Sequence, residues 1–253
     1  MYNNGASISE LEFSFDIGLR NQYPFNIPAL SGLTKLQLHP QVTFFVGENG
    51  TGKSTLIEAI AVALGFNAEG GTKNFNFSSR ASHSDLYKYL KVPFRTKRHK
   101  DGFFLRSESF FNLTTQIEDL DREPSAGRRI IDSYGGKSLH EQSHGESFWA
   151  LFLHRFSDDG LYIFDEPEAA MSPSRQMAML CRMQQMIENG SQFIIATHSP
   201  ILIAYPNALI YEFSQDGIVT KSYKETELFN SYYHFLHDSD NFMTHLLHLK
   251  EED

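Results

Sequence analysis

Residues 42–54 read VTFFVGENGTGKS, and this stretch decides how the chain folds. Its first part, residues 42–46, is a short apolar run typical of a buried strand, and a glycine-rich turn follows it directly. Residues 54–64 (STLIEAIAVAL) are rich in Leu, Ile and Ala, and Gly65 stands where a helix would end. We therefore expect a buried strand, a tight turn and a helix in direct succession.

The turn between this strand and this helix satisfies the pattern G-x-x-x-x-G-K-[ST] in full. Glycines allow successive backbone N–H groups to face a phosphate, and the helix N-terminus adds positive potential. We expect Lys53 to reach the β- and γ-phosphates of ATP and Ser54 to bind Mg²⁺. A plain capping turn would explain the glycines but not the adjacent Lys and Ser. The predicted nucleotide-binding residues are Gly47, Glu48, Asn49, Gly50, Thr51, Gly52, Lys53, Ser54 and Thr55.

A second apolar run, residues 161–164 (LYIF), leads directly into Asp165 and Glu166. Ligands of open α/β sheets bind at the carboxyl ends of the strands, so both carboxylates are expected at that edge. We expect Asp165 to hold Mg²⁺ through a water and Glu166 to orient and deprotonate the attacking water, an effect typically worth about 10²–10⁴ in rate. An acidic turn after a strand is the simpler interpretation, and the phosphate loop upstream favours the catalytic one.

His198 follows a third apolar run, residues 193–196 (FIIA). A neutral imidazole at this strand end could donate a hydrogen bond to the γ-phosphate or to the attacking water. A histidine in this setting is otherwise structural. We therefore predict three catalytic residues, Lys53, Glu166 and His198.

The order of these elements favours one α/β domain over residues 1–253. A helical stretch at about residues 174–188 separates the second and third apolar runs, which implies a right-handed parallel crossover. Residues 11–19 alternate apolar and polar side chains, as a half-buried strand does. The tail from residue 225 to about 250 is expected to form two short helices broken near Asp238.

Residues 67–142 are more polar and less regular, and we expect them to form a lid or insert within the domain. Within this region we expect residues 86–92 and 102–105 to pair as a hairpin across a basic turn, RTKRHK. Its cations could contact nucleic-acid phosphates, although runs of charge are usually solvated. The residues concerned are Arg95, Lys97, Arg98 and Lys100, with Arg128 and Arg129 as neighbours.

Composition restricts the class of protein. A hydrophobic fraction of 41% and a charged fraction of 21% are those of an ordinary globular chain. No apolar run approaches the roughly 20 residues that cross a bilayer, and the first residues do not resemble a secretory signal, so we expect a cytoplasmic protein without membrane insertion. The net charge of −9 argues against general attraction to nucleic acid.

Together these motifs resemble the ABC-type ATPase superfamily, and within it the non-transporter branch of RecF, SMC and OLD-like proteins. The chain is similar to short stand-alone bacterial ATPases described as AAA/ABC-family, over most of its length. The resemblance implies a P-loop NTPase core of the ABC-ATPase type with a mostly parallel sheet, an N-terminal antiparallel β element and a small helical or hairpin lid. It also implies Mg²⁺-dependent ATP hydrolysis by a homodimer with ATP between its subunits.

The resemblance assigns further segments by position. Residues 142–146 (QSHGE) take the place of the signature LSGGQ, from which they depart at three positions, and Ser143 and Gly145 would reach the nucleotide of the second subunit. Residues 168–172 would form the D-loop. A Ser N-cap with an acidic first turn is the simpler account of residues 143–146.

Two functional positions are left open between candidates. Glu108 or Gln116 would sense Mg²⁺, and Tyr23 or Phe25 would stack on adenine, although an aromatic residue there is more often part of the core. We predict that ATP turnover serves a DNA-related task such as repair or phage defence, with DNA or a nuclease or other effector as partner. The alternatives are the ATP-binding subunit of a transporter and a nucleotide-sensing module that controls a partner effector.

Overall fold

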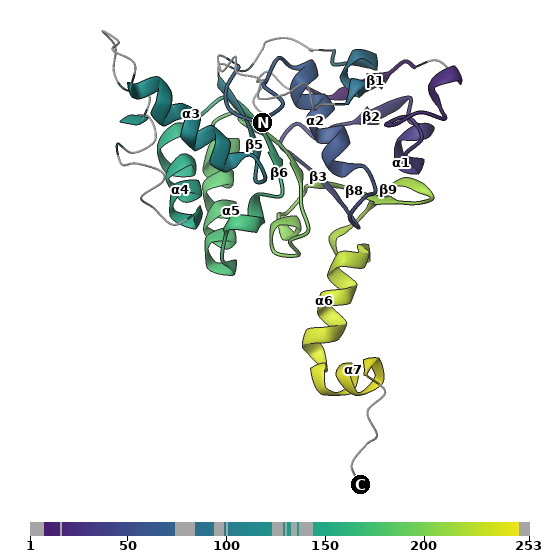
Figure 1. The fold of residues 1–253 in the computed structure, drawn as a ribbon. Coiled ribbons are helices and arrows are strands. Elements are labelled where there is room, and N and C mark those ends of the chain that lie inside the picture. The colour runs from purple at the N-terminus through teal and green to yellow at the C-terminus, as the bar shows by residue number, and fades with distance from the viewer. Residues whose placement is uncertain are drawn as a thin grey trace.

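The computed structural model of the protein describes residues 8–15, 17–73, 84–93, 99, 101–122, 129, 131–132, 136 and 144–247. A six-stranded sheet runs through the middle of the body, with helices on both faces, and two C-terminal helices project away from it (Figure 1). This arrangement confirms the predicted α/β class with a mostly parallel sheet.

The central sheet brings the predicted site residues to one edge. Its strand order is β5-β6-β7-β3-β8-β9, in which the first five strands are parallel and β9 pairs antiparallel with β8. Because the strands are parallel, the residues that follow β3, β6 and β7 lie at the same edge. In this order the strands are β5 (Asp101–Arg106), β6 (Gly160–Asp165), β7 (Gln192–Ala196), β3 (Val42–Gly47), β8 (Leu209–Ser214) and β9 (Gly217–Lys221).

Side chains of these strands alternate between two hydrophobic cores, one on each face of the sheet. Phe44 belongs to the core that also contains residues of α3 (Phe110–Arg122), α4 (His144–Ala150) and α5 (Pro173–Glu188). Its neighbour Phe45 belongs to the opposite core, with α2 (Lys53–Ala63). Strands covered on both faces are apolar throughout, which is why the runs used in the sequence analysis are continuous.

A three-stranded antiparallel sheet covers α2 and confirms the expected N-terminal β element. Its order is β2-β1-β4, with β1 at Glu10–Phe13, β2 at Lys35–Gln37 and β4 at Leu90–Lys91. The strand expected over residues 11–19 is therefore shorter than predicted, because the chain leaves the sheet and forms a 3₁₀ turn at Ile17–Leu19. The short helix α1 (Pro28–Ser31) lies between β1 and β2 in the sequence.

The predicted hairpin of residues 86–92 and 102–105 is wrong. Its first half is a 3₁₀ helix (Asp85–Tyr89) followed by β4, which pairs with β1, while its second half is β5, which pairs in parallel with β6. The physical reason lies in β5 itself, where Phe103 and Phe104 are buried in opposite cores. A strand that buries both faces needs a place in a covered sheet, and an exposed hairpin does not offer one. The basic turn lies outside the described residues, apart from His99.

The remaining helices begin and end close to the predicted positions. The helix after the Gly-Lys-Ser sequence ends at Ala63, and Gly65 follows with a φ of +85°. The crossover between β6 and β7 contains α5 as expected, and α4 continues into a π-helical turn at Leu151–Arg155. Further 3₁₀ turns occur at Pro167–Ala170, Leu202–Ala204 and Tyr223–Glu225.

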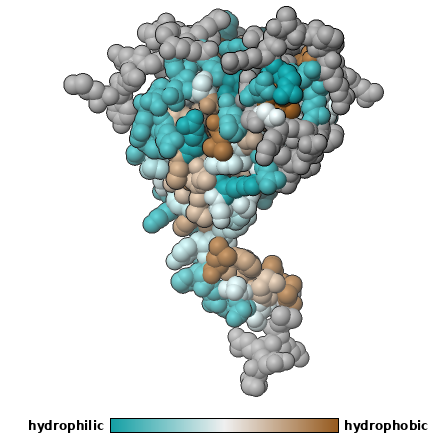
Figure 2. Space-filling view, turned by 90° about the vertical axis from the view of Figure 1, so that its left-hand side faces the viewer, coloured by the Kyte–Doolittle hydropathy of each residue, from teal (hydrophilic) through white to brown (hydrophobic). Residues whose placement is uncertain are grey.

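The tail forms the two predicted helices, α6 (Glu227–His237) and α7 (Ser239–Leu246), with Asp238 at the break. They form an arm that extends from the body (Figure 1), and no residue of either helix is buried. Hydrophobic surface is visible on the arm in Figure 2. The exposed apolar residues of the two helices include Leu236 and Leu246. Across the residues that the structure describes, no helix combines the length and the apolar character needed to span a membrane.

The π-helical turn after α4 allows a matched test of the core. Leu151 is fully buried in the core beside α4, whereas Leu153, two residues later, is 48% exposed. Leu151→Ala should lower the free energy of unfolding by about 2–5 kcal/mol because it leaves a cavity in a packed core. Leu153→Ala should change it by about 0.5 kcal/mol or less. Urea denaturation measures the free energy of unfolding of both variants. Similar losses would contradict the burial of Leu151 and the exposure of Leu153.

Candidate nucleotide-binding site

The loop between β3 and α2 depends on its glycines. Gly47, Gly50 and Gly52 have φ angles of +132°, +79° and +101°, which L side chains rarely adopt. A Cβ at Gly47 would also lie 2.2 Å from the carbonyl oxygen of Phe213 on β8. The loop is held from within by the Thr51 hydroxyl, which donates to the Glu48 carbonyl at 2.8 Å. The loop conformation therefore depends on the glycines, on the Thr51 hydrogen bond and, at Gly47, on close packing against β8.

Lys53 supplies a buried cation to this loop. Its Nζ donates to the carbonyl oxygens of Gly47 and Glu48, both at 2.7 Å, so the side chain lies along the turn. Burial lowers the pKa of Lys53, and the carboxylates of Glu166 and Asp165 act in the opposite direction. The Lys53 side chain is thus held inside the glycine turn by two backbone carbonyl groups.

Ser54 and Asp165 meet although 111 positions separate them in the sequence. The Ser54 hydroxyl donates to Asp165 Oδ1 at 3.0 Å, which joins the first turn of α2 to the end of β6. Burial raises the pKa of Asp165 to about 6, although Arg106 and Ser54 lower it. A hydroxyl and a carboxylate at this distance are the hard oxygen donors that Mg²⁺ prefers, so these residues fit the predicted ion.

Glu166 and His198 form the next part of the site. His198 Nε2 lies 3.5 Å from Glu166 Oε1, so the residues after β6 and β7 meet as the parallel sheet requires. Glu166 has a left-handed backbone (φ 53°, ψ 52°), which is costly for a residue with a side chain and is common at functional sites. Two contacts hold it there, since its N–H donates to Ala196 O and its carbonyl accepts from Ser107 Oγ. Burial and Lys53 lower the pKa of His198.

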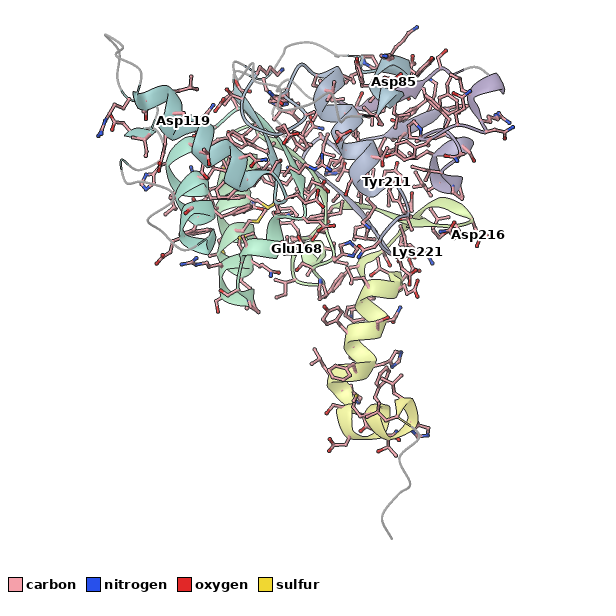
Figure 3. All side chains as sticks on the ribbon, viewed as in Figure 1. Asp85, Asp119, Glu168, Tyr211, Asp216 and Lys221 are labelled. Atoms are coloured by element: carbon pink, nitrogen blue, oxygen red, sulfur yellow. The ribbon has the colours of Figure 1, made fainter. Side chains whose placement is uncertain are left out.

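Glu168 contacts the backbone of His198. Its carboxylate accepts a hydrogen bond from the His198 backbone N–H, and burial raises its pKa. The sequence analysis placed Glu168 only in the D-loop region, without this contact. In Figure 3 Glu168 lies near the point where the arm leaves the body, whereas Asp119 lies away on α3.

A cavity lies between the phosphate loop and the base of the arm. It has a volume of about 150 Å³ and contains Gly47, Glu48 and His198 on one side, with Glu212, Glu227, Leu228 and Ser231 on the other. The Glu227 N–H donates to Glu212 Oε1 at 2.7 Å, which fixes the first turn of α6 against β8. The arm therefore starts beside the phosphate loop.

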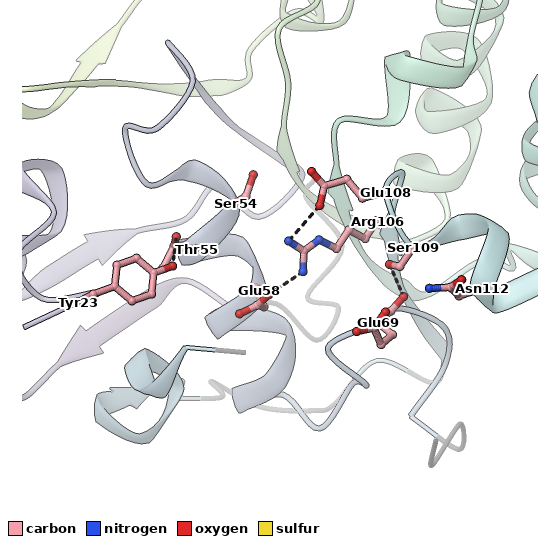
Figure 4. Close-up of a pocket in the computed structure, with 9 residues that line it drawn as sticks. All are labelled: Tyr23, Ser54, Thr55, Glu58, Glu69, Arg106, Glu108, Ser109 and Asn112. Atoms are coloured by element: carbon pink, nitrogen blue, oxygen red, sulfur yellow. Dashed lines mark hydrogen bonds and ion pairs between the residues drawn. The ribbon is translucent and has the colours of Figure 1, made fainter. Parts of the chain in front are cut away.

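The sequence analysis missed Arg106 and Glu58. Arg106 ends β5 directly beside Asp165 in the sheet register, and its Nη1 lies 2.7 Å from Glu58 Oε2 (Figure 4). Both face a polar cavity of about 370 Å³ beside Ser54. Glu58 could have been found from its position one helical turn after Ser54. Arg106 follows an apolar run as Asp165 does, but the expected hairpin placed that run outside the central sheet.

The structure bears on the two pairs of candidates for adenine stacking and for sensing Mg²⁺. Tyr23 is 66% exposed and its hydroxyl lies 3.4 Å from Thr55 Oγ1 in the same cavity, whereas Phe25 is 3% exposed and belongs to the core. Glu108 lies just after β5, with Oε2 3.4 Å from Arg106 Nη2. The side chain of Gln116 lies outside the described residues.

The predicted signature segment is only partly described. Ser143 lies outside the described residues, whereas Gly145 lies in the first turn of α4. A Cβ at Gly145 would lie 2.6 Å from Arg175 Nη1 and 2.7 Å from the carbonyl oxygen of Ala170. Gly145 therefore packs closely on the backbone of Ala170 in its own chain, and this close approach requires glycine.

The cations proposed to meet nucleic acid lie mostly beyond what is described. Arg95, Lys97, Arg98, Lys100 and Arg128 are outside the described residues, and Arg129 forms an ion pair with Asp132 at 3.2 Å. Among the described residues, no group of three or more His, Cys, Asp or Glu side chains is arranged to hold a metal ion by itself.

The pKa of Asp165 leads to a prediction about stability and pH. A carboxyl whose folded pKa, about 6, exceeds its ordinary value of 3.8 opposes folding where it is ionised, and this cost disappears as the pH falls from 6 to 4. Asp165→Asn retains an acceptor for Ser54 and should raise the free energy of unfolding by about 1–3 kcal/mol at pH 7.5, without nucleotide or metal. At pH 4 the gain should vanish.

Denaturant titrations at both pH values provide the measurement. Asp216→Asn, in the exposed turn between β8 and β9, is the control and should have little effect at either pH. An equal effect of Asp165→Asn at pH 7.5 and pH 4 would contradict the assigned cause.

Comparisons with known proteins found a matching family and several similar chains. The profile of a family described as an AAA domain matches residues 21–158. The cobalt import ATP-binding protein CbiO of Salmonella typhimurium is 26% identical over 211 residues, covering 77% of this chain and 75% of that protein. A solved ABC transporter in an inward-facing conformation has a TM-score of 0.50 at 14% identity, covering 92% of this chain and 89% of the other. The SMC head domain from Thermotoga maritima gives a TM-score of 0.45 at 15% identity, with 85% and 99% covered.

The family profile spans more than half of the chain and includes the phosphate loop. The chain belongs to the family described as an AAA domain.

Proposed function

We propose that this ATPase binds Mg²⁺-ATP at the loop of residues 47–55 and hydrolyses it with Glu166 and His198, as a homodimer that encloses the nucleotide between its subunits. The observation that carries the proposal is the convergence at one sheet edge of a buried lysine, a hydroxyl–carboxylate pair and a carboxylate–imidazole pair. These are the parts that phosphoryl transfer to water needs.

The first group of residues binds and positions the nucleotide. Lys53 would exchange its two carbonyl partners for phosphate oxygens, and the backbone N–H groups of the loop would complete the binding. Ser54 and Asp165 would hold Mg²⁺, which supplies charge neutralisation at the transferred phosphate. Tyr23 is the better placed of the two aromatic candidates for contact with the nucleoside, because it is exposed beside Thr55.

The second group acts on the attacking water. Glu166 would accept the proton of this water. Two backbone hydrogen bonds hold Glu166 in its strained conformation: its carbonyl accepts from the Ser107 hydroxyl, and its N–H donates to the Ala196 carbonyl. The lowered pKa of His198 favours a neutral imidazole at pH 7, which can donate one hydrogen bond and accept another. The Glu168 contact with the His198 backbone fixes the position of the ring.

The homodimer is proposed from the predicted signature segment. Ser143 and Gly145 of a second copy would complete the nucleotide site, as the resemblance to ABC-type ATPases implies. The close packing of Gly145 on Ala170 and Arg175 supports this, since it couples the signature segment to the residues that follow Glu166. A symmetric pair would contain two identical composite sites.

We further propose a DNA-related task for this ATPase. The support is the D-loop sequence Ala169-Ala170-Met171-Ser172 and the altered signature, which differ from the sequences usual in transporter subunits. The ATP-binding subunit of a transporter is the second candidate, favoured by the similarity to CbiO. Phosphate release measured with and without double-stranded DNA separates them, because stimulation by DNA supports the first and is not expected of the second. Turnover that stays negligible in both conditions would instead support a nucleotide-sensing module.

Substitution of the proposed base tests both hydrolysis and dimerisation. Glu166→Gln should reduce the rate of phosphate release by about 10²-fold or more, because the amide cannot accept the proton, while ATP binding persists. Since the nucleotide is then retained, size-exclusion chromatography with light scattering should show a dimer with Mg²⁺-ATP and a monomer without it.

Glu188→Gln, at the exposed end of α5, is the matched control and should behave as the unmodified protein does. Lys53→Ala should abolish ATP binding and therefore the dimer. If Glu166→Gln binds ATP but stays monomeric, the composite site is wrong; if it hydrolyses ATP at the normal rate, Glu166 is not the base.

A further inference from the structure

Arg106 lies in the centre of a group of carboxylates next to the proposed metal ligands. Its Nη1 lies 2.7 Å from Glu58 Oε2, and its Nη2 lies 3.4 Å from Glu108 Oε2. Its Nε lies 3.8 Å from Asp165 Oδ2. Figure 4 shows its guanidinium between Glu58 and Glu108, on the wall of the cavity that also contains Ser54. One cation therefore neutralises parts of three acidic side chains.

Without Arg106 these oxygens would form an attractive site for a divalent cation. Glu58 lies one helical turn after Ser54 and lines the same cavity, and Ser54 donates to the buried carboxylate of Asp165. The Ser54 hydroxyl therefore lies between the elements that carry two buried carboxylates. Hard divalent cations prefer such oxygen ligands, and affinity rises with the number of charged ones. The side chain of Arg106 is only 22% exposed, so water screens its charge weakly.

The contact between Arg106 and Asp165 is the weakest of the three. The Nε group is buried and has no hydrogen-bond partner, and its distance of 3.8 Å to Asp165 exceeds that of a hydrogen bond. Arg106 is anchored instead by Glu58 on α2, whose other oxygen accepts from the Ser84 N–H at 3.1 Å. Its positive charge thus remains beside Asp165 whether or not Asp165 turns toward another ligand.

We propose that Arg106 is a specificity-determining residue that excludes free divalent cations from the empty site, so that Mg²⁺ enters together with ATP. This inference rests on the proposed function. A metal ion beside Asp165 is repelled by the fixed guanidinium and by Lys53, and the negative phosphates of the nucleotide offset this repulsion. The ATPase thereby avoids trapping metal in a form that cannot turn over.

The test measures Mn²⁺, as a spectroscopic probe for Mg²⁺, by electron paramagnetic resonance of the free ion at pH 7.5. Unmodified nucleotide-free protein should bind Mn²⁺ at least tenfold more weakly than the same protein with a non-hydrolysable ATP analogue. Arg106→Gln should bind Mn²⁺ at least tenfold more tightly than the unmodified protein when nucleotide is absent. Arg106→Lys retains the charge and should retain the exclusion.

Arg155→Gln is the matched control. Arg155 pairs with Asp101 at the other end of β5, with Nη1 to Oδ2 at 2.8 Å, and its side chain is similarly shielded at 19% exposure. Its loss frees the carboxylate of Asp101, which also accepts from the Ser157 hydroxyl at 2.9 Å, whereas loss of Arg106 frees the carboxylates of three residues. Arg155→Gln should therefore create no comparable Mn²⁺ site. Circular dichroism establishes that each variant is folded.

The outcomes are distinct. The proposal is wrong if folded Arg106→Gln gains no Mn²⁺ affinity, or if Arg155→Gln gains as much. If Arg106→Gln does not fold, the unmodified protein still decides, because Mn²⁺ binding that is equally tight with and without nucleotide overturns the proposal. Failure of the unmodified protein to bind the ATP analogue at all would instead refute the proposed function.

Discussion

The buried carboxylate of Asp165 is the constraint on which the rest of the site depends. It lies at the end of a strand covered on both faces, and burial raises its pKa to about 6. A charge in such a position must be compensated, and the surrounding residues supply a hydroxyl from α2 and a guanidinium from β5. The two carboxylate oxygens of Asp165 therefore link the start of α2 to the ends of β5 and β6.

This link makes the architecture and the chemistry inseparable. The parallel order of β5, β6, β7 and β3 places Arg106, Asp165, His198 and the phosphate loop side by side, although they come from four distant segments. The left-handed backbone of Glu166 carries a conformational cost, whereas the positive φ of Gly47 is one that glycine adopts readily. Packing of two complete cores against the sheet provides the stability that sustains these conformations.

The arm of α6 and α7 differs from the body in energetic character. Its helices bury none of their residues, but its first turn borders the cavity that also contains His198 and Glu48. The arm, which extends away from the described body (Figure 1), therefore begins beside the proposed nucleotide site.

The sequence by itself determined the parts whose cause is local. The glycines of the phosphate loop predict its conformation, and the end signals of the long helices predict where they stop. The continuous apolar runs predict strands that are covered on both faces. Because parallel strands end at one edge, the meeting of Ser54, Asp165, Glu166 and His198 could also be anticipated. The roles of these residues stay predictions.

Only the tertiary structure decided the partners of β4 and β5. The sequence of a short apolar strand does not indicate which strands it pairs with. Because residues 102–105 were expected to form a hairpin, the position of Arg106 beside Asp165 was not predicted. The choice depends on which neighbours cover both faces of the strand, and these come from distant segments of the chain. For the same reason the cation that balances Asp165 could not be named from the sequence, whereas the carboxylate itself could.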